Sequence, residues 1–414
     1  MAVIRPFKGI RPIKELANKI AALPYDVMDS DEAREMVKGN PYSFLHVDKA
    51  EIDLPNDIDA YDDRVYEKAK ENLDKMIEKG YYIEDEKPKF YIYRQVMKGR
   101  SQVGLVGCAS IDDYTNNIIK KHELTREDKE IDRINHVYKC EAHTGPIFLT
   151  YRANKNISNI INEWMKKEPV YDFKSEDGVS HTVWIIEDEC IVNKISELFK
   201  SVEYLYIADG HHRSASAVKV GHIKRAENEE YTGDEEFNYF LSISYPDSEL
   251  EVLDYNRTVK DLNGLSKEEF LNKVSENFIV TKSNEQVKPK EKHTFGMYLE
   301  KQWYLLEARN GIFNPDDPVD QLDVSILQNN LLKPILGIDD PRKSKRIKFV
   351  GGIRGLRELE RRADTDMKVS FSMYATTTDD IMDIADSGRI MPPKSTWFEP
   401  VSYTHLTLPT IYSV

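Results

Sequence analysis

The segment from 204 to 217 constrains the fold of this chain more than any other stretch. An apolar run, YLYIA, passes through Asp209 and Gly210 directly into residues rich in alanine and serine. Aromatic and β-branched residues favour a strand, and glycine permits the sharp turn that leads from a strand into a helix. A buried strand followed at once by a helix is typical of layered α/β proteins, in which helices cover a sheet.

Strands and helices alternate through the middle of the chain as well. Local apolar patterns predict strands at 90–96, 103–110, 182–186, 203–208 and 237–245, and helices at 62–79, 157–165 and 191–199. Beyond residue 245, Ser266 and Glu269 have the spacing of a helix capping box. A hairpin is predicted from 294–299 and 303–308, and a final strand at 369–374 precedes a helix around Ile381. This alternation predicts a mixed α/β fold.

The chain of 414 residues is longer than one hydrophobic core usually serves. We expect an N-terminal extension of turns and helices at 1–88, an α/β core at 89–245 and an α+β domain at 246–400. Residues 401–414 form an atypical tail that resembles a frameshift or assembly artefact.

The composition of the chain limits the classes of partner that it can bind. The formal net charge is −14, and a negative surface repels nucleic acid, which basic proteins attract. No run approaches the roughly 20 apolar residues of a membrane helix. Three cysteines without a CxxC motif, and an N-terminus without a secretion signal, predict a cytoplasmic protein. An anionic small molecule would therefore be held by local donors.

The turn Asp209-Gly210-His211-His212-Arg213 carries the strongest chemical signal. A helix that begins here offers free backbone N–H groups and the positive end of its dipole, which suit a phosphate. Arg213 adds a planar fork of donors, and Asp209 is a candidate ligand for magnesium. The alternative is a plain helix start that Asp209 caps, with both histidines on the surface.

Several stretches match a known family. The chain resembles, from about Arg5 to Pro400, the uncharacterised family named domain of unknown function 1015. The matching motifs are RPFKGIRP at 5–12, LPYD at 23–26, KHELT at 121–125, TGPI at 144–147, DGHHR at 209–213 and PPKSTW at 392–397.

Three of these segments are also similar, in the same order, to free serine kinases with a ParB/sulfiredoxin-like fold. They are residues 122–124, 209–213 and 393–396. The resemblance implies a ParB/sulfiredoxin-like core at 89–245, with the C-terminal domain completing a cleft. It also implies transfer of a phosphoryl group to the hydroxyl of free L-serine, or of a similar small molecule, from ATP, ADP or pyrophosphate with Mg²⁺.

The resemblance assigns roles to individual residues. Glu123 corresponds to the catalytic glutamate, which would accept the proton of the hydroxyl as general base. The other assignments are catalytic Asp209 and His212; phosphate-binding Gly210, His211, Arg213, Ser214 and Lys394; and substrate-binding His122, Ser395 and Thr396.

Other readings stay open at this point. The charged run at 120–130 is also typical of a solvated helix face, and Asp128, Asp132 and His136 either line the same cleft or face water. Residues 143–146 fit a simple turn. The main functional alternative is a non-catalytic nucleotide-binding module of the same fold.

Overall fold

A computed structural model of the chain describes residues 1–400 and 408–409. These residues form two compact units. The first contains Met1–Leu250 together with the described residues from Pro400 onward, and the second is Glu251–Glu399. Each unit has a sheet and a hydrophobic core of its own, and each is described by itself below.

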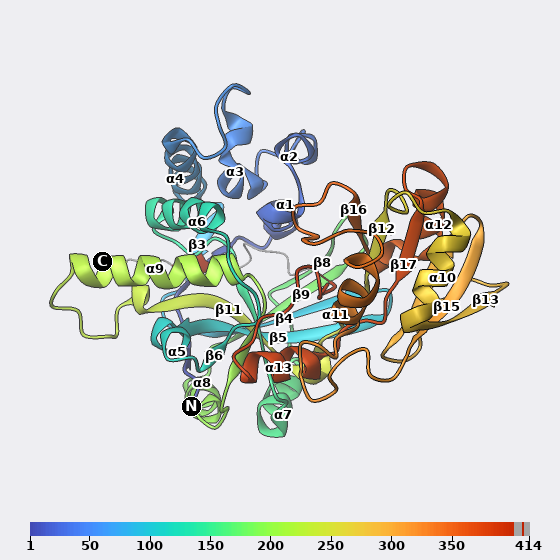
Figure 1. Cartoon of the computed structure of the whole chain (residues 1–414). Helices are drawn as coiled ribbons and strands as arrows, with labels where there is room; N and C mark the ends of the chain where they lie inside the picture. Colours follow the sequence, from blue (N-terminus) through green and yellow to red (C-terminus); the bar gives the residue numbers. More distant parts are fainter. Residues whose placement is uncertain (401–407, 410–414) are drawn as a thin grey trace. The chain divides into compact units, whose positions relative to one another are not determined.

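The first unit is built on a mixed sheet that has nine strands among the described residues (Figure 1). Its strand order is β6-β10-β7-β11-β5-β4-β9-β8, and β1 pairs with β5 at one side of this path. The strands are β1 (Ile4–Arg5), β4 (Phe90–Met97), β5 (Arg100–Ser110), β6 (Ile119–Lys120), β7 (Ile147–Tyr151), β8 (Tyr171–Lys174), β9 (Ser180–Ile186), β10 (Leu205–Asp209) and β11 (Tyr239–Pro246).

Two pairs in this sheet are parallel, and the rest are antiparallel. β10 runs parallel to β6, with Leu205 opposite Ile119 and Tyr206 opposite Lys120. β11 runs parallel to β7, whereas β4, β5 and β9 pair in antiparallel fashion. Because β6 and β10 are parallel and in register, the residues that follow each strand emerge at the same edge of the sheet.

Helices cover this sheet in layers, as Figure 1 shows for α4, α6 and α9. On the buried side of α7 and α8, Ile157, Ile161 and Ile195 join the main cluster of the core. The helices of this unit are α1 (Ala17–Ile20), α2 (Ser30–Met36), α3 (Leu45–Asp48), α4 (Asp63–Glu78), α5 (Ile111–Thr115), α6 (Glu127–Cys140), α7 (Lys155–Trp164), α8 (Glu189–Phe199) and α9 (His211–Glu227).

The N-terminal region contains strands that the sequence did not predict. Ile4 of β1 pairs with Ala109 of β5, so the start of the chain joins the main sheet. A small sheet has the order β18-β2-β3, from β2 (Gly9–Pro12), β3 (Tyr82–Glu84) and β18 (Leu408–Pro409). The rest of the atypical tail, 401–407 and 410–414, lies outside the described residues. These strands are two to four residues long, too short for a clear alternation of side chains.

The second unit contains a six-stranded antiparallel sheet with the order β13-β15-β14-β17-β12-β16. Its strands are β12 (Tyr255–Val259), β13 (Phe278–Ser283), β14 (Thr294–Leu299), β15 (Gln302–Ala308), β16 (Ile347–Gly351) and β17 (Val369–Ser372). Its helices are α10 (Lys267–Asn277), α11 (Asp323–Leu327), α12 (Leu356–Thr365) and α13 (Thr378–Asp386). Apolar residues from the sheet and helices, such as Phe270, Phe371 and Ile381, form its core.

The structure confirms the mixed α/β prediction and most of the predicted elements. β4, β5, β9, β10 and β11 lie where apolar patterns predicted them, and so do α4, α7 and α8. The capping box of α10 is present, because the Ser266 hydroxyl accepts from the Glu269 amide and the Glu269 carboxylate accepts from the Ser266 amide. The two units divide at Leu250, and the domain boundaries expected at 88 and 245 stay predictions.

Close packing of α9 gives a first prediction. A Cβ at Gly221 would lie 2.5 Å from the carbonyl oxygen of Phe237 and 2.7 Å from Cδ1 of Ile111. Gly→Ala usually stabilises a helix, but here overpacking should lower the free energy of unfolding by about 1–3 kcal/mol. Urea denaturation of Gly221→Ala measures this loss. Lys219→Ala, at an exposed position of the same helix, is the control, and a stabilised Gly221→Ala would contradict the packing.

Candidate functional site

The parallel pairing of β6 and β10 brings two sequence motifs together. β6 is followed by Lys121, His122 and Glu123, and β10 ends at Asp209, just before His211. The rings of His122 and His211 meet edge to face, with centroids 4.5 Å apart and an interplanar angle of 84°. Oε2 of Glu123 lies 3.8 Å from Nδ1 of His211. The structure thus brings the proposed base beside the predicted phosphate-binding turn.

The turn itself leaves the N-terminus of α9 open. Gly210 is the N-cap residue and has a φ of 92°, a left-handed conformation that glycine adopts without strain. The N-cap residue is Gly210 and not Asp209, so the alternative in which Asp209 occupies the cap position is wrong. The first backbone N–H groups of a helix have no partner inside the helix, and the dipole adds partial positive charge there. The 17 residues of α9 therefore begin with a site suited to an anion.

Two buried histidines stand at this open end. His122 and His211 are 2% and 5% exposed, which contradicts the reading of His211 as a surface residue. Burial lowers the pKa of His122 to about 4, and burial together with His122 holds the pKa of His211 well below its usual range. Both rings are therefore neutral at pH 7. Among residues 1–400, Nδ1 of His122 and Nε2 of His211 find no hydrogen-bond partner, and a buried polar atom left without one costs about 1–3 kcal/mol.

Arg213 is held firmly within the turn. Its Nη1 donates to the carbonyl oxygen of Pro146 at 2.7 Å, and its Nη2 donates to Oδ2 of Asp209 at 2.6 Å. Its Nε is buried and has no hydrogen-bond partner in the described part of the chain. Burial lowers the pKa of Arg213, but Asp209 and other acidic neighbours raise it overall. The guanidinium is thus a fixed positive charge whose terminal nitrogens already have protein partners, rather than the free fork that the sequence suggested.

His212 and Ser214 have local hydrogen bonds. The backbone N–H of Arg126 donates to Nε2 of His212 at 3.0 Å, which ties the loop before α6 to α9. Burial lowers the pKa of His212. The hydroxyl of Ser214 donates to the carbonyl oxygen of His211 at 2.9 Å, inside the helix. These contacts fix the shape of the turn, and the catalytic role of His212 stays a prediction.

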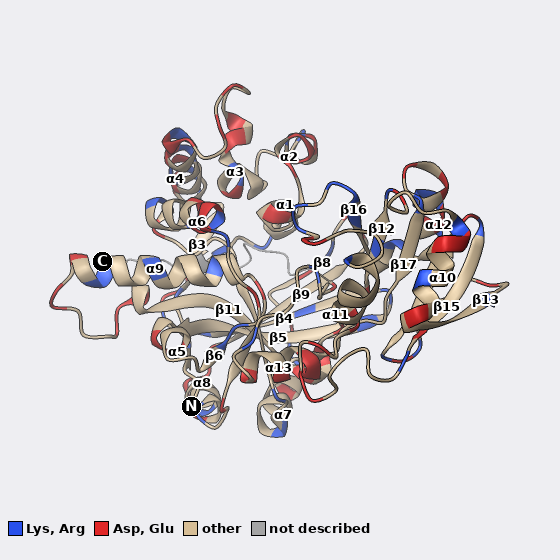
Figure 2. Ribbon diagram, in the orientation of Figure 1, with Lys and Arg blue, Asp and Glu red and all other residues tan. Residues whose placement is uncertain are grey.

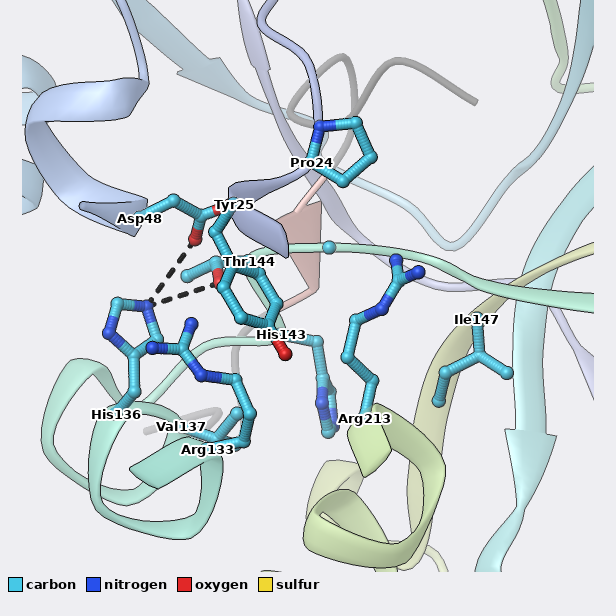
Figure 3. Close-up of a pocket in the computed structure, with 11 residues that line it drawn as sticks. Pro24, Tyr25, Asp48, Arg133, His136, Val137, His143, Thr144, Ile147 and Arg213 are labelled. Carbon is cyan, nitrogen blue, oxygen red and sulfur yellow. Dashed lines mark hydrogen bonds and ion pairs between the residues drawn. The ribbon is translucent and has the colours of Figure 1, made fainter. Parts of the chain in front are cut away.

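A small cavity lies on the inner side of Arg213 (Figure 3). Its volume is about 20 Å³, which is close to the space that one water molecule needs. Three of the family motifs contribute to its lining, because residues of LPYD, TGPI and DGHHR meet there. Its lining residues are Pro24, Tyr25, Asp48, Arg133, His136, Val137, His143, Thr144, Gly145, Ile147 and Arg213.

His136 is the centre of a buried polar network at this cavity. Its Nε2 lies 3.5 Å from Oδ1 of Asp48 and 3.2 Å from the Thr144 hydroxyl, as the dashed lines of Figure 3 show. Burial lowers the pKa of His136, but Cys140 and Asp48 together raise it to about 9. His136 is therefore protonated at pH 7. The His136 side chain is buried and lines this cavity, so it does not face water.

Arg133, which stacks on the ring of Tyr25, also lines the cavity, and the sequence did not predict this. The guanidinium of Arg133 lies 3.9 Å from the centroid of the Tyr25 ring, and its Nε donates to Asp132 at 2.8 Å. The one available signal was the LPYD motif itself, which supplies Tyr25. Asp132 is buried, whereas Asp128 is exposed and pairs with Arg126.

Lys394, Ser395 and Thr396 belong to the second unit. Ser395 is 6% exposed, and its hydroxyl donates to the carbonyl oxygen of Pro392 at 2.6 Å. Lys394 has a φ of 58°, and its carbonyl oxygen accepts from Nη2 of Arg257 at 2.9 Å. The roles of these three residues in phosphate and substrate binding stay predictions.

The residues of the turn do not fit a magnesium ion held by the protein alone. Across 1–400 and 408–409, the structure contains no group of three or more acidic, histidine or cysteine side chains arranged for a metal. The Asp209 carboxylate is paired with Arg213.

On a larger scale, charge is mixed over the surface helices: acidic and basic residues are interspersed along α4, α6 and α12 (Figure 2). Within the described part of the chain, no helix is long and apolar enough to cross a membrane.

Burial of His122 predicts a pH dependence of stability. The folded protein keeps His122 neutral down to about pH 4, whereas the unfolded chain binds a proton near pH 6.5. The contribution of a neutral His122 to the free energy of unfolding is therefore complete above pH 6.5. It is lost as the pH falls from 6.5 to 4, at about 1.4 kcal/mol per pH unit. Urea denaturation at several pH values gives the free energy of unfolding as a function of pH. Between pH 4 and 6.5 this free energy should change less steeply with pH for His122→Gln than for the wild type.

The control for this experiment is His222→Gln, at an exposed position of α9. It should keep the slope of the wild type. Equal slopes for the wild type and His122→Gln would contradict a neutral, buried His122.

Comparison with solved structures finds distant neighbours. The chain is similar to a free serine kinase in complex with AMP, at 14% identity and a TM-score of 0.34, over 70% of this chain and 85% of that one. It is also similar to SbnI from Staphylococcus aureus, at 9% identity and a TM-score of 0.39, over 74% and 87%. A conserved hypothetical protein from Pyrococcus furiosus is similar at 14% identity and a TM-score of 0.33, over 72% of this chain and 94% of that one. Scores this low do not decide an activity.

The family comparison is more direct. No curated protein matches the chain. A family model described as protein of unknown function (DUF1015) matches residues 4–325, which include every residue of the turn and of the small cavity. The resemblance seen in the sequence motifs is confirmed, and the chain belongs to the DUF1015 family.

Proposed function

We propose that this protein is a small-molecule phosphotransferase whose active site is the open N-terminus of α9. The observation that carries the proposal is the approach of Glu123 to within 3.8 Å of His211, at a helix start whose N-cap residue is Gly210. A carboxylate that accepts a proton and a donor-rich site for a phosphoryl group are the two parts that phosphoryl transfer to a hydroxyl needs. Glu123 and the start of α9, which we assign to these two parts, follow the neighbouring parallel strands β6 and β10.

In the proposed reaction, the helix start holds the phosphoryl group. The backbone N–H groups of the first turn and the fixed charge of Arg213 favour the negative oxygens. Glu123, whose side chain is about half exposed, accepts the proton of the substrate hydroxyl. The hydroxyl oxygen then forms a bond to phosphorus as the bond to the leaving oxygen breaks, which yields a phosphate ester and the shortened donor.

The proposed acceptor is free L-serine or a similar small hydroxyl compound, and the proposed donor is ATP, ADP or pyrophosphate. These assignments follow the resemblance of 122–124 and 209–213 to free serine kinases. The buried, neutral rings of His122 and His211 support a site for a polar ligand, because each has a nitrogen without a partner. A bound ligand would satisfy these nitrogens.

Binding of a nucleotide without transfer is the second candidate, and one observation favours it. Both terminal nitrogens of Arg213 already donate to Pro146 and Asp209, so this arginine is less available to stabilise a transferring group. Tight binding of nucleotide to the purified chain, with no phosphorylated product, would support this candidate over the enzyme.

The proposal predicts a specific loss of activity in Glu123→Gln. The purified protein is incubated with serine and each donor in turn, and O-phosphoserine is measured by mass spectrometry. Removal of a general base should lower kcat by about 10²–10⁴-fold, with little change in the KM of the donor. Glu127→Gln, at the exposed start of α6, is the matched control and should keep full activity.

Two outcomes of this assay would contradict different parts of the proposal. No product from the wild type with any donor would remove the phosphotransferase function. Full activity in Glu123→Gln would keep the function but remove Glu123 as the base.

A second pair of variants tests the turn. Arg213→Ala removes the contacts to Pro146 and Asp209, and Asp209→Asn removes the charge that Arg213 faces. We expect turnover to fall by at least about 10²-fold in both, the usual cost of losing one oriented donor, while circular dichroism shows a folded protein. Arg225→Ala, in the last turn of α9, is the control. Activity like that of the wild type in both turn variants would contradict the proposed site.

A further inference from the structure

The second unit contains a larger pocket, which the proposed phosphotransferase site does not include. Its volume is about 380 Å³, and it lies among β12, β16, the helical turn Gln328–Leu332 and residues 392–393. The pocket thus includes the two prolines of the PPKSTW motif. A space of this size is within the range of pockets that hold small organic molecules.

Arg257 lines this pocket from β12 and is deeply buried. It is only 4% exposed, because β12 lies between two other strands, and Arg257 pairs with Phe349 of β16 on one side and Phe371 of β17 on the other. Its Nη1 donates to the carbonyl oxygen of Tyr255, and its Nη2 donates to that of Lys394 at 2.9 Å. Among the described residues, no carboxylate forms an ion pair with it, and the Tyr255 hydroxyl is the neighbour that favours its charged form.

A buried arginine without an acidic partner is costly. Arginine is almost never fully buried unless it is paired, because taking a charge out of water costs several kcal/mol. Burial lowers the pKa of Arg257 to about 10, so the guanidinium is still charged at pH 7. Two carbonyl oxygens satisfy hydrogen bonds but do not neutralise this charge. An anion in the pocket would supply the missing negative charge.

The other walls of the pocket indicate what kind of anion fits. Leu332, Ile347, Phe349 and the prolines form an apolar surface, and the Arg257 guanidinium lies 5.4 Å from the centroid of the Phe349 ring. The other charged lining residues are Asp339, Asp340 and Arg342. All three are more exposed than Arg257, and Arg342 pairs with Asp340. A deep positive charge beside apolar walls suits a ligand with an anionic group and an apolar ring.

We propose that this pocket binds a small organic anion, whose carboxylate or phosphate group pairs with Arg257 and whose flat apolar part packs against Phe349. The site belongs to the second unit, and it does not depend on the proposed phosphotransferase activity. Each terminal nitrogen of Arg257 carries a second N–H besides the one that donates to Tyr255 or Lys394, and these remaining donors suit carboxylate or phosphate oxygens.

The test uses the full chain and four probes: benzoate, phenyl phosphate, inorganic phosphate and benzamide. Binding is measured by calorimetry, and its location by protection of residues 328–332 and 347–351 from amide hydrogen exchange. We expect benzoate or phenyl phosphate to bind and to protect these residues. Their relative affinities distinguish a carboxylate ligand from a phosphate ligand. Inorganic phosphate, which lacks the ring, and benzamide, which lacks the charge, should each bind at least about tenfold more weakly.

Arg257→Met removes the charge at similar volume and should weaken binding of the aromatic anions by about tenfold or more. Arg346→Met is the matched control, because Arg346 pairs with Asp261 and does not line the pocket. Three results would each overturn the proposal: no protection by either aromatic anion, equal binding of benzamide and benzoate, or full binding by a folded Arg257→Met. The comparison of benzamide with benzoate in the wild type remains decisive if Arg257→Met does not fold.

Discussion

The parallel pairing of β6 with β10 is the contact on which the candidate site depends. β6 is only two residues long, yet its register with Leu205 and Tyr206 determines where the chain goes next. Because both strands point the same way, His122 and Glu123 leave the sheet beside the start of α9. An antiparallel β6 would send these residues to the opposite edge of the sheet, and Glu123 could not serve the turn.

The turn is held in place by its neighbours before any ligand arrives. Arg213 joins Asp209 to the carbonyl of Pro146, and His212 joins α9 to the loop before α6. Such prior positioning reduces the reorganisation that a reaction needs. The same fixed geometry leaves two buried histidine nitrogens without partners. Both nitrogens lie beside the start of α9, where a bound ligand would satisfy them.

Local patterns predicted much of the fold, and contacts between distant segments account for what they missed. The apolar run before Asp209 and the glycine after it predicted β10 and α9, because strand and helix periods are visible within a few residues. β6 was hidden in a charged run that resembles a solvated helix. The meeting of Tyr25 with Arg133 joins residues far apart in sequence, and no local pattern encodes it. Likewise, no local pattern around Arg257 indicates that its strand, β12, pairs with another strand on each side.

The most direct test of the central claim is to observe the start of α9 while a donor binds. The protein is labelled with ¹⁵N at histidine only, and its NMR spectrum is recorded with increasing ADP. The account predicts shifts of the backbone amides of His211 and His212, together with a change in the ring signals of His122 and His211. Saturable binding of ADP that leaves these four residue signals unchanged would show that the phosphates bind elsewhere, and would contradict the account.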